Sequence, residues 1–203
     1  MIVSGNGTQT VRNLITHQTL FAVLITGYAI TFICDIVAAW ALYILLKPVN
    51  VYLSGLTALF RLVFAIVAIV SLLNLTNTFR MITAPDYLNL FKTDQLAAQV
   101  MLSANAFRTG FHFGLLFFGI YLGLLGYLVW RLTYIPSILG LLLAISGLGY
   151  FATSLQPYLF PGINISFATY TFFGELIFMF WLIIRGWRIQ KTYYSGAVVR
   201  PVS

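Results

Sequence analysis

Long apolar stretches restrict the fold of this chain more than any other feature. About 20 apolar residues are enough to cross the hydrocarbon core of a lipid bilayer as a helix. Only helices and closed barrels satisfy their backbone hydrogen bonds in lipid, and the alternating pattern of barrel strands is absent. We find five such stretches, at about 19–46, 53–75, 105–130, 136–156 and 167–185. The sequence therefore predicts an all-α integral membrane bundle with about five transmembrane helices.

The composition leaves little room for a soluble domain. Only 7% of the 203 residues are charged and 61% are hydrophobic, and the mean hydropathy is +0.95. Values this apolar are typical of multi-pass membrane proteins and exclude most soluble classes. We expect a polar N-terminal stub at 1–18 without a cleavable signal peptide, a bundle at 19–187 and a basic cytoplasmic tail at 188–203.

The longest connection, residues 77–104, is predicted to form a separate element. Pro85-Asp86 is typical of a turn, and Thr93-Asp94-Gln95 has residues that commonly begin a helix. We expect this segment to lie on the outer membrane surface as an amphipathic element or to cover the bundle as a lid.

The basic residues predict the orientation of the chain. With five spans, one side of the membrane carries six basic residues and the other side carries three. A further basic residue, Arg108, lies near the edge of the third span on that second side. Cytoplasmic loops are enriched in Lys and Arg, so we expect a cytoplasmic C-terminus. Anionic lipids account for the net charge of +7 without a nucleic-acid partner. The first side carries Lys47, Arg131, Arg185, Arg188, Lys191 and Arg200, and the second carries Arg12, Arg80 and Lys92.

Three ionisable residues, Asp35, Arg61 and Glu175, lie inside apolar stretches. Such groups are costly in a membrane and usually face the protein interior, where they pair with one another. Asp35 and Arg61 are equally far in sequence from Pro48, at the tip of the first hairpin. A rise of about 1.5 Å per residue places both roughly 20 Å from that tip, near the bilayer midplane. Glu175 has a similar predicted depth, so we expect one intramembrane charge cluster.

Two interpretations of this cluster stay open. Hydroxyl groups on the same helix faces, from Thr31, Thr57 and Thr171, are expected to supply further hydrogen bonds to the charges. One arginine with two carboxylates leaves a negative charge unless one acid is protonated. The cluster is therefore either an ion-pair device that fixes helix packing or a site that handles a proton or ligand.

Other chemistry finds no support in the sequence. We find no phosphate-binding loop, nucleotide-binding glycine pattern, nucleophile elbow or zinc-protease motif, and hence no catalytic motif. One cysteine and two histidines without a supporting motif predict no metal site and no cofactor. Recurrent small residues in the third and fourth stretches instead predict a close helix–helix contact. They are Gly110, Gly114, Gly119, Gly123, Gly126, Gly140, Ala144 and Gly147.

Several short strings in order along the chain are typical of a known family. They include Cys34-Asp35-Ile36, Leu46-Lys47-Pro48-Val49-Asn50, Phe60-Arg61-Leu62-Val63, Ile135-Pro136-Ser137-Ile138-Leu139-Gly140 and Gly174-Glu175-Leu176. On these strings, the chain resembles the domain-of-unknown-function 4386 family of bacterial multi-pass membrane proteins. The likeness extends from about Leu14 to Gly186 and implies that the three charged residues belong to the family pattern, without implying an activity. Family members are expected to begin with a further upstream span, giving six. Without that span, a groove would face lipid or a second protomer, which makes a homodimer an expected arrangement.

Two functional hypotheses follow, together with a weaker third. The first is a non-catalytic protein of the bacterial inner membrane whose charge cluster fixes helix packing and which acts through lipids or partners. The second is a small proton-coupled carrier or ligand-binding protein that uses the same cluster for an unknown small molecule. The third is an intramembrane enzyme. A sealed, fully bonded cluster would favour the first hypothesis, and a cavity reaching the cluster would favour the others.

Overall fold

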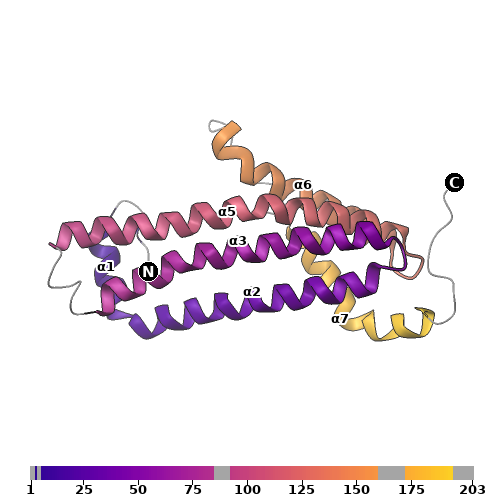
Figure 1. The fold of residues 1–203 in the computed structure, drawn as a ribbon, viewed down its shortest axis with the longest axis horizontal. Helices are drawn as coiled ribbons and strands as arrows, with labels where there is room; N and C mark the ends of the chain where they lie inside the picture. Colours follow the sequence, from indigo (N-terminus) through magenta and orange to yellow (C-terminus); the bar gives the residue numbers. More distant parts are fainter. Residues whose placement is uncertain (1–2, 4–5, 85–91, 160–171, 194–203) are drawn as a thin grey trace. The chain divides into compact units, whose positions relative to one another are not determined.

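All the regular elements in the described part of the chain are α-helices (Figure 1). The computed structural model describes residues 3, 6–84, 92–159 and 172–193, the last eight of these as backbone only. The predicted all-α class is confirmed. The helices are α1 Gly7–Thr16, α2 Gln18–Leu46, α3 Val51–Thr83, α5 Thr93–Arg131, α6 Ser137–Leu159 and α7 Phe173–Tyr193.

Four of these helices, α2, α3, α5 and α6, are long and apolar enough to cross a membrane. They correspond to the first four predicted stretches. The fifth, at 167–185, overlaps the N-terminal part of α7, but residues 160–171 lie outside the described residues, and α7 is not among the candidate spans found there. Many large apolar side chains on the four candidate spans are exposed, including Trp40 at 66% and Leu148 at 72%. Exposed apolar surface on this scale is suited to contact with lipid.

Helices occupy most of the described residues in two segments that were predicted to lie outside the membrane spans. Residues 77–83 continue α3 and residues 93–104 belong to α5, so most of the expected outer segment consists of helix extensions. Its turn, at 85–91, lies outside the described residues. The expected N-terminal stub contains helix α1. The Asn6 side chain caps the start of this helix by accepting a hydrogen bond from the Gln9 backbone N–H at 2.9 Å. Val11 and Leu14, one turn apart, are buried on its inner face. The tail beyond Tyr193 is outside the described part.

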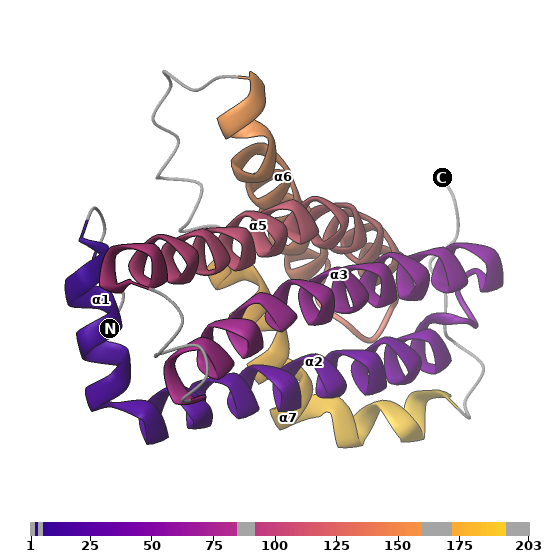
Figure 2. The same cartoon turned by 60° about the vertical axis from the view of Figure 1, so that its left-hand side comes forward.

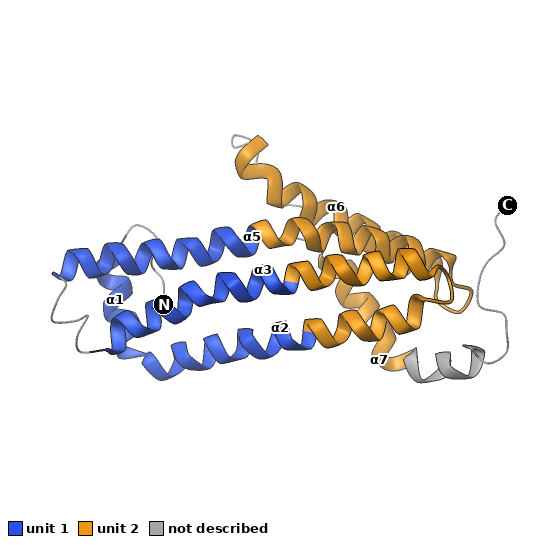
Figure 3. Cartoon of the chain, in the orientation of Figure 1, with its two compact units in different colours: residues 1–34, 65–112 blue, residues 35–64, 113–203 orange. Residues whose placement is uncertain are grey.

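Two compact units divide the helices, and α2, α3 and α5 contribute to both (Figure 3). Unit 1 comprises residues 1–34 and 65–112. Aromatic side chains connect its helices: Phe21 of α2 contacts Phe79 of α3, with ring centroids 6.2 Å apart. Tyr28 of α2 lies against Phe107 of α5, at 5.5 Å. These contacts give unit 1 an aromatic core.

Unit 2 comprises residues 35–64 and 113–203, and a glycine seam joins its α5 and α6 helices. A Cβ atom built on Gly119 would lie 2.7 Å from the Gly147 carbonyl oxygen, and one on Gly126 would lie 2.5 Å from that of Gly140. The two backbones therefore touch where both helices carry glycine, as the spacing predicts. Gly174 of α7 also approaches the backbone of α6, and both views show α6 alongside α5 (Figures 1 and 2).

Candidate functional site

The candidate site forms in unit 2, where a short turn joins α2 to α3. The Asn50 side chain accepts from the Leu53 backbone N–H at 2.9 Å and so caps the start of α3. The Ser54 hydroxyl donates to the Tyr43 carbonyl oxygen at 3.0 Å and ties the two helices together. Farther along the pair, Arg61 Nη2 lies 2.5 Å from Asp35 Oδ1. The structure thus brings together the two charges whose predicted depths are equal.

This ion pair is only partly buried. The Arg61 and Asp35 side chains are 13% and 15% exposed, and the next residues on α2, Ile36 and Val37, are exposed as well. We expected a buried pair in the bundle interior. None of the charged residues in the described part is classed as buried. The pair is therefore partly exposed rather than enclosed in the interior of unit 2.

Tyr121 of α5 is a site residue that sequence reasoning missed. Its hydroxyl accepts a hydrogen bond from Arg61 Nη1, and its ring lies 4.9 Å from the guanidinium carbon. The Phe118 ring, one turn away, lies 5.9 Å from the same carbon. Cation–π contacts of this kind stabilise a desolvated guanidinium. The Tyr121 residue is only 2% exposed. The only feature of the sequence that could have indicated its role is a single hydroxyl between Gly119 and Gly123.

Glu175 lies near the pair but does not bond to it. It lies in the first turn of α7, and within the described residues its carboxylate makes no hydrogen bond or ion pair. It interacts electrostatically with Arg61 without contacting it. The predicted cluster of three therefore separates into a bonded pair, Asp35 and Arg61, and an unbonded acid beside it.

A cleft of about 320 Å³ connects Glu175 to the bonded pair. Its polar lining residues are Arg61, Tyr121 and Glu175, and the rest of its wall is apolar. Arg61 Nε is buried and has no hydrogen-bond partner among the residues that the structure describes. The cleft therefore combines one unbonded carboxylate, one unused N–H donor and an apolar surface. The apolar lining consists of Ala38, Ala41, Leu42, Leu45, Leu125, Phe178, Met179 and Leu182.

Two of the three predicted supporting hydroxyls, those of Thr31 and Thr57, donate to their own helices rather than to the charges. Thr31 donates to the Gly27 carbonyl oxygen at 2.9 Å, and Thr57 donates to that of Leu53 at 2.7 Å. A threonine in a helix commonly bonds the carbonyl one turn earlier, which satisfies its hydroxyl locally. Thr171 lies outside the described residues. Tyr121 supplies the hydroxyl that the threonines were expected to supply.

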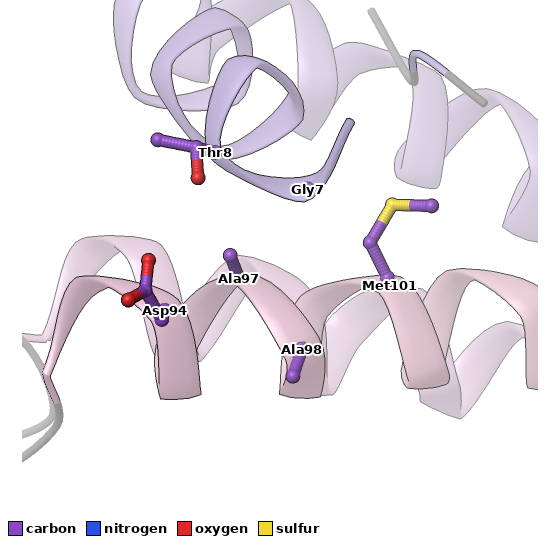
Figure 4. Close-up of a pocket in the computed structure, with 6 residues that line it drawn as sticks. All are labelled: Gly7, Thr8, Asp94, Ala97, Ala98 and Met101. Atoms are coloured by element: carbon purple, nitrogen blue, oxygen red, sulfur yellow. The ribbon is translucent and has the colours of Figure 1, made fainter. Parts of the chain in front are cut away.

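Two other cavities are weaker candidates for a functional site than this cleft. One, of about 330 Å³, lies between α1 and α5 in unit 1, with Thr8 and Asp94 at one end and Met101 at the other (Figure 4). The second, of about 360 Å³, lies between α2 and α3 beside Trp40 and Tyr43 and is lined without charged residues. No cluster of potential metal ligands occurs in the part of the chain that is described.

Comparison with known proteins identifies the family. The family described as "Domain of unknown function (DUF4386)" matches residues 1–186. A protein of Archaeoglobus fulgidus, described as "Uncharacterized protein", is 35% identical over 168 residues, which cover 83% of this chain and 86% of that protein. Relatives are thus not confined to bacteria. No solved structure matches this chain. The extent of the family match shows that the chain belongs to the DUF4386 family.

Proposed function

We propose that this membrane protein binds a small ligand in the cleft that ends at Glu175, in the manner of a small proton-coupled carrier. The observation that carries the proposal is the unbonded Glu175 carboxylate, which lines a cleft of about 320 Å³ together with Arg61 and Tyr121. An apolar pocket with a few convergent polar groups is the usual form of a small-molecule site. An ionisable group at membrane depth that lacks a fixed partner is a candidate for ligand or proton binding.

The Asp35–Arg61 pair has a different role in this proposal. Arg61 already bonds Asp35 of α2 and Tyr121 of α5, so it holds three helices in register around the cleft. Its charge is compensated by Asp35 within a direct contact. Glu175 is then the group that is free to exchange a proton or to meet a ligand. The pair acts as a scaffold, and Glu175 acts as the binding group.

Glu175→Gln separates these roles. The amide keeps the size of the side chain and removes its charge, and no bond to a described residue is lost. We expect the free energy of unfolding to change by less than about 0.5 kcal/mol, while ligand- or proton-linked activity is lost. The measurement is reversible unfolding in mixed micelles together with proton flux in proteoliposomes. Unaltered proton flux in a folded variant would refute the titrating role.

A packing-only protein is the second candidate function. It is favoured by the contact of Arg61 with both Asp35 and Tyr121, which joins three helices without any ligand. In that case, the cleft holds lipid chains, and Glu175 contributes only through its place at the start of α7. The Glu175→Gln experiment distinguishes the two candidates, because a packing-only protein has no ligand-linked activity to lose.

We further propose that the protein spans the plasma membrane with its C-terminus in the cytoplasm. Basic residues are enriched in the 188–203 tail and near Lys47 and Arg131, as the positive-inside rule requires. A C-terminal fusion to green fluorescent protein is expected to fluoresce, and the matched fusion to alkaline phosphatase is expected to be inactive. An active phosphatase fusion would reverse the proposed orientation.

A further inference from the structure

We infer that the ligand of the Glu175 cleft is a monovalent organic cation with an apolar body, an inference that rests on the function proposed above. The first argument is charge. Asp35 and Arg61 compensate each other at 2.5 Å, so Glu175 leaves one uncompensated negative charge in the lining of the cleft. A carboxylate in an apolar environment gains most from a cation that brings its own apolar surface with it.

The lining of the cleft agrees with this class of ligand. Ala38 and Ala41 are small and leave space, whereas Phe178 and Met179 bring an aromatic ring and a polarisable thioether to the side of α7 that carries Glu175. Aromatic rings and thioethers attract organic cations more strongly than they attract anions. Because the spacing of one helical turn places Glu175 and Phe178 or Met179 on one face, a single cation can contact all three.

The same geometry disfavours an anionic ligand. Arg61 is the only cation in the lining, and its charge already serves Asp35. An anion that approached Arg61 would therefore meet two carboxylates. The unused N–H donor at Arg61 Nε requires only a neutral acceptor, such as a water or an ether or carbonyl oxygen of the ligand.

Competition with protons follows from this assignment. The charged groups that act on Glu175 are Asp35 on α2 and Arg61 on α3. Glu175 in turn acts on the hydroxyls of Tyr121 on α5 and Tyr150 on α6. A proton and the organic cation require the same Glu175 carboxylate, so each excludes the other. Cation affinity should therefore rise as the pH rises, and it should reach a plateau once the carboxylate is fully ionised.

Benzyltrimethylammonium is the probe for this inference, and neopentylbenzene is its neutral counterpart with carbon in place of nitrogen. The anionic probe is benzylsulfonate. Binding of each radiolabelled probe to the purified full chain in detergent micelles would be measured at equilibrium, across an acidic-to-alkaline pH series. We expect saturable binding of the cation alone, with an affinity that falls as the pH falls. Glu175→Gln should weaken that affinity by about tenfold or more.

Two variants locate the binding. Ala41→Phe adds a ring to the cleft wall and should reduce cation binding while leaving the charges in place. Asp94→Asn removes a carboxylate from unit 1 and should leave binding unchanged. Both variants would be checked for unaltered unfolding, so that a loss of binding reports on the cleft.

The outcomes separate this inference from the proposed function. If the neutral or anionic probe binds instead and Ala41→Phe abolishes that binding, the cleft is a ligand site but the ligand is not a cation. If none of the three probes binds and Glu175→Gln leaves proton flux unchanged, both proposals fail. If the cation binds equally well to Glu175→Gln, the assignment of the carboxylate is overturned.

Discussion

Arg61→Ala lowers the free energy of unfolding by about 3 kcal/mol, the largest effect that we expect from a change at the site. Removing the guanidinium leaves Asp35 without a partner in apolar surroundings and removes the ring contact with Tyr121. A largely buried carboxylate that loses its partner costs more free energy than the ion pair itself contributes. The effect would be measured by reversible unfolding in mixed micelles, followed by tryptophan fluorescence.

Arg80→Ala is the matched control, because Arg80 is an exposed residue on the same helix, and the structure gives it no ion pair with any described residue. It should change the free energy of unfolding by no more than about 0.5 kcal/mol. The double variant Asp35→Ala with Arg61→Ala should be more stable than the sum of the single effects implies, by roughly 1–3 kcal/mol. Additive single effects would contradict a coupled pair.

The Asp35–Arg61 contact is the part of the site that sequence reasoning predicted best. A four-residue turn between two continuous helices leaves little freedom, so an equal separation from Pro48 fixes an equal depth. Glu175 lacks such a constraint, because its helix is reached through residues 160–171 rather than through a short hairpin. Depth alone therefore could not show that its carboxylate would lie beside the pair without contacting it.

Tyr121 illustrates a second limit of prediction from a single sequence. Its hydroxyl meets Arg61 because α5 packs against α3 in unit 2, and no spacing along the sequence encodes the rotation of one helix against another. The threonines failed for the opposite reason, since their own helix offers a carbonyl oxygen one turn away. The start of α5 at Thr93 agrees with the predicted helix start, whereas the continuation of α3 through residues 77–83 and helix α1 were not predicted. Polar helical turns of this kind continue apolar ones without a change of period.

The glycine seam was predictable as a feature, although its exact members were not. Glycine recurrence in two neighbouring spans indicates close approach, and Gly119, Gly126, Gly140 and Gly147 confirm it. Gly123 has the same spacing, but a Cβ atom there would have nothing within 4 Å. Which glycines are engaged depends on the crossing of the helices, which single-sequence spacing does not contain. This difference provides an internal control for the last prediction.

Gly126→Ala should weaken the α5–α6 contact, whereas Gly123→Ala should not. A Cβ atom on Gly126 would lie 2.5 Å from the Gly140 carbonyl oxygen and 2.8 Å from the Ala144 backbone nitrogen. These neighbours are backbone atoms, so no side-chain rotation relieves the clash and the helices must separate. We expect a loss of about 2 kcal/mol or more from the free energy of unfolding, as for other overpacked interiors.

The control should behave in the opposite way. Alanine favours helix over glycine by up to about 1 kcal/mol, and Gly123→Ala meets no neighbouring atom, so this variant should be as stable as the parent or slightly more stable. Equal losses in both variants would mean that the α5–α6 seam does not limit stability. A loss confined to Gly126→Ala would locate the stabilising contact in the seam.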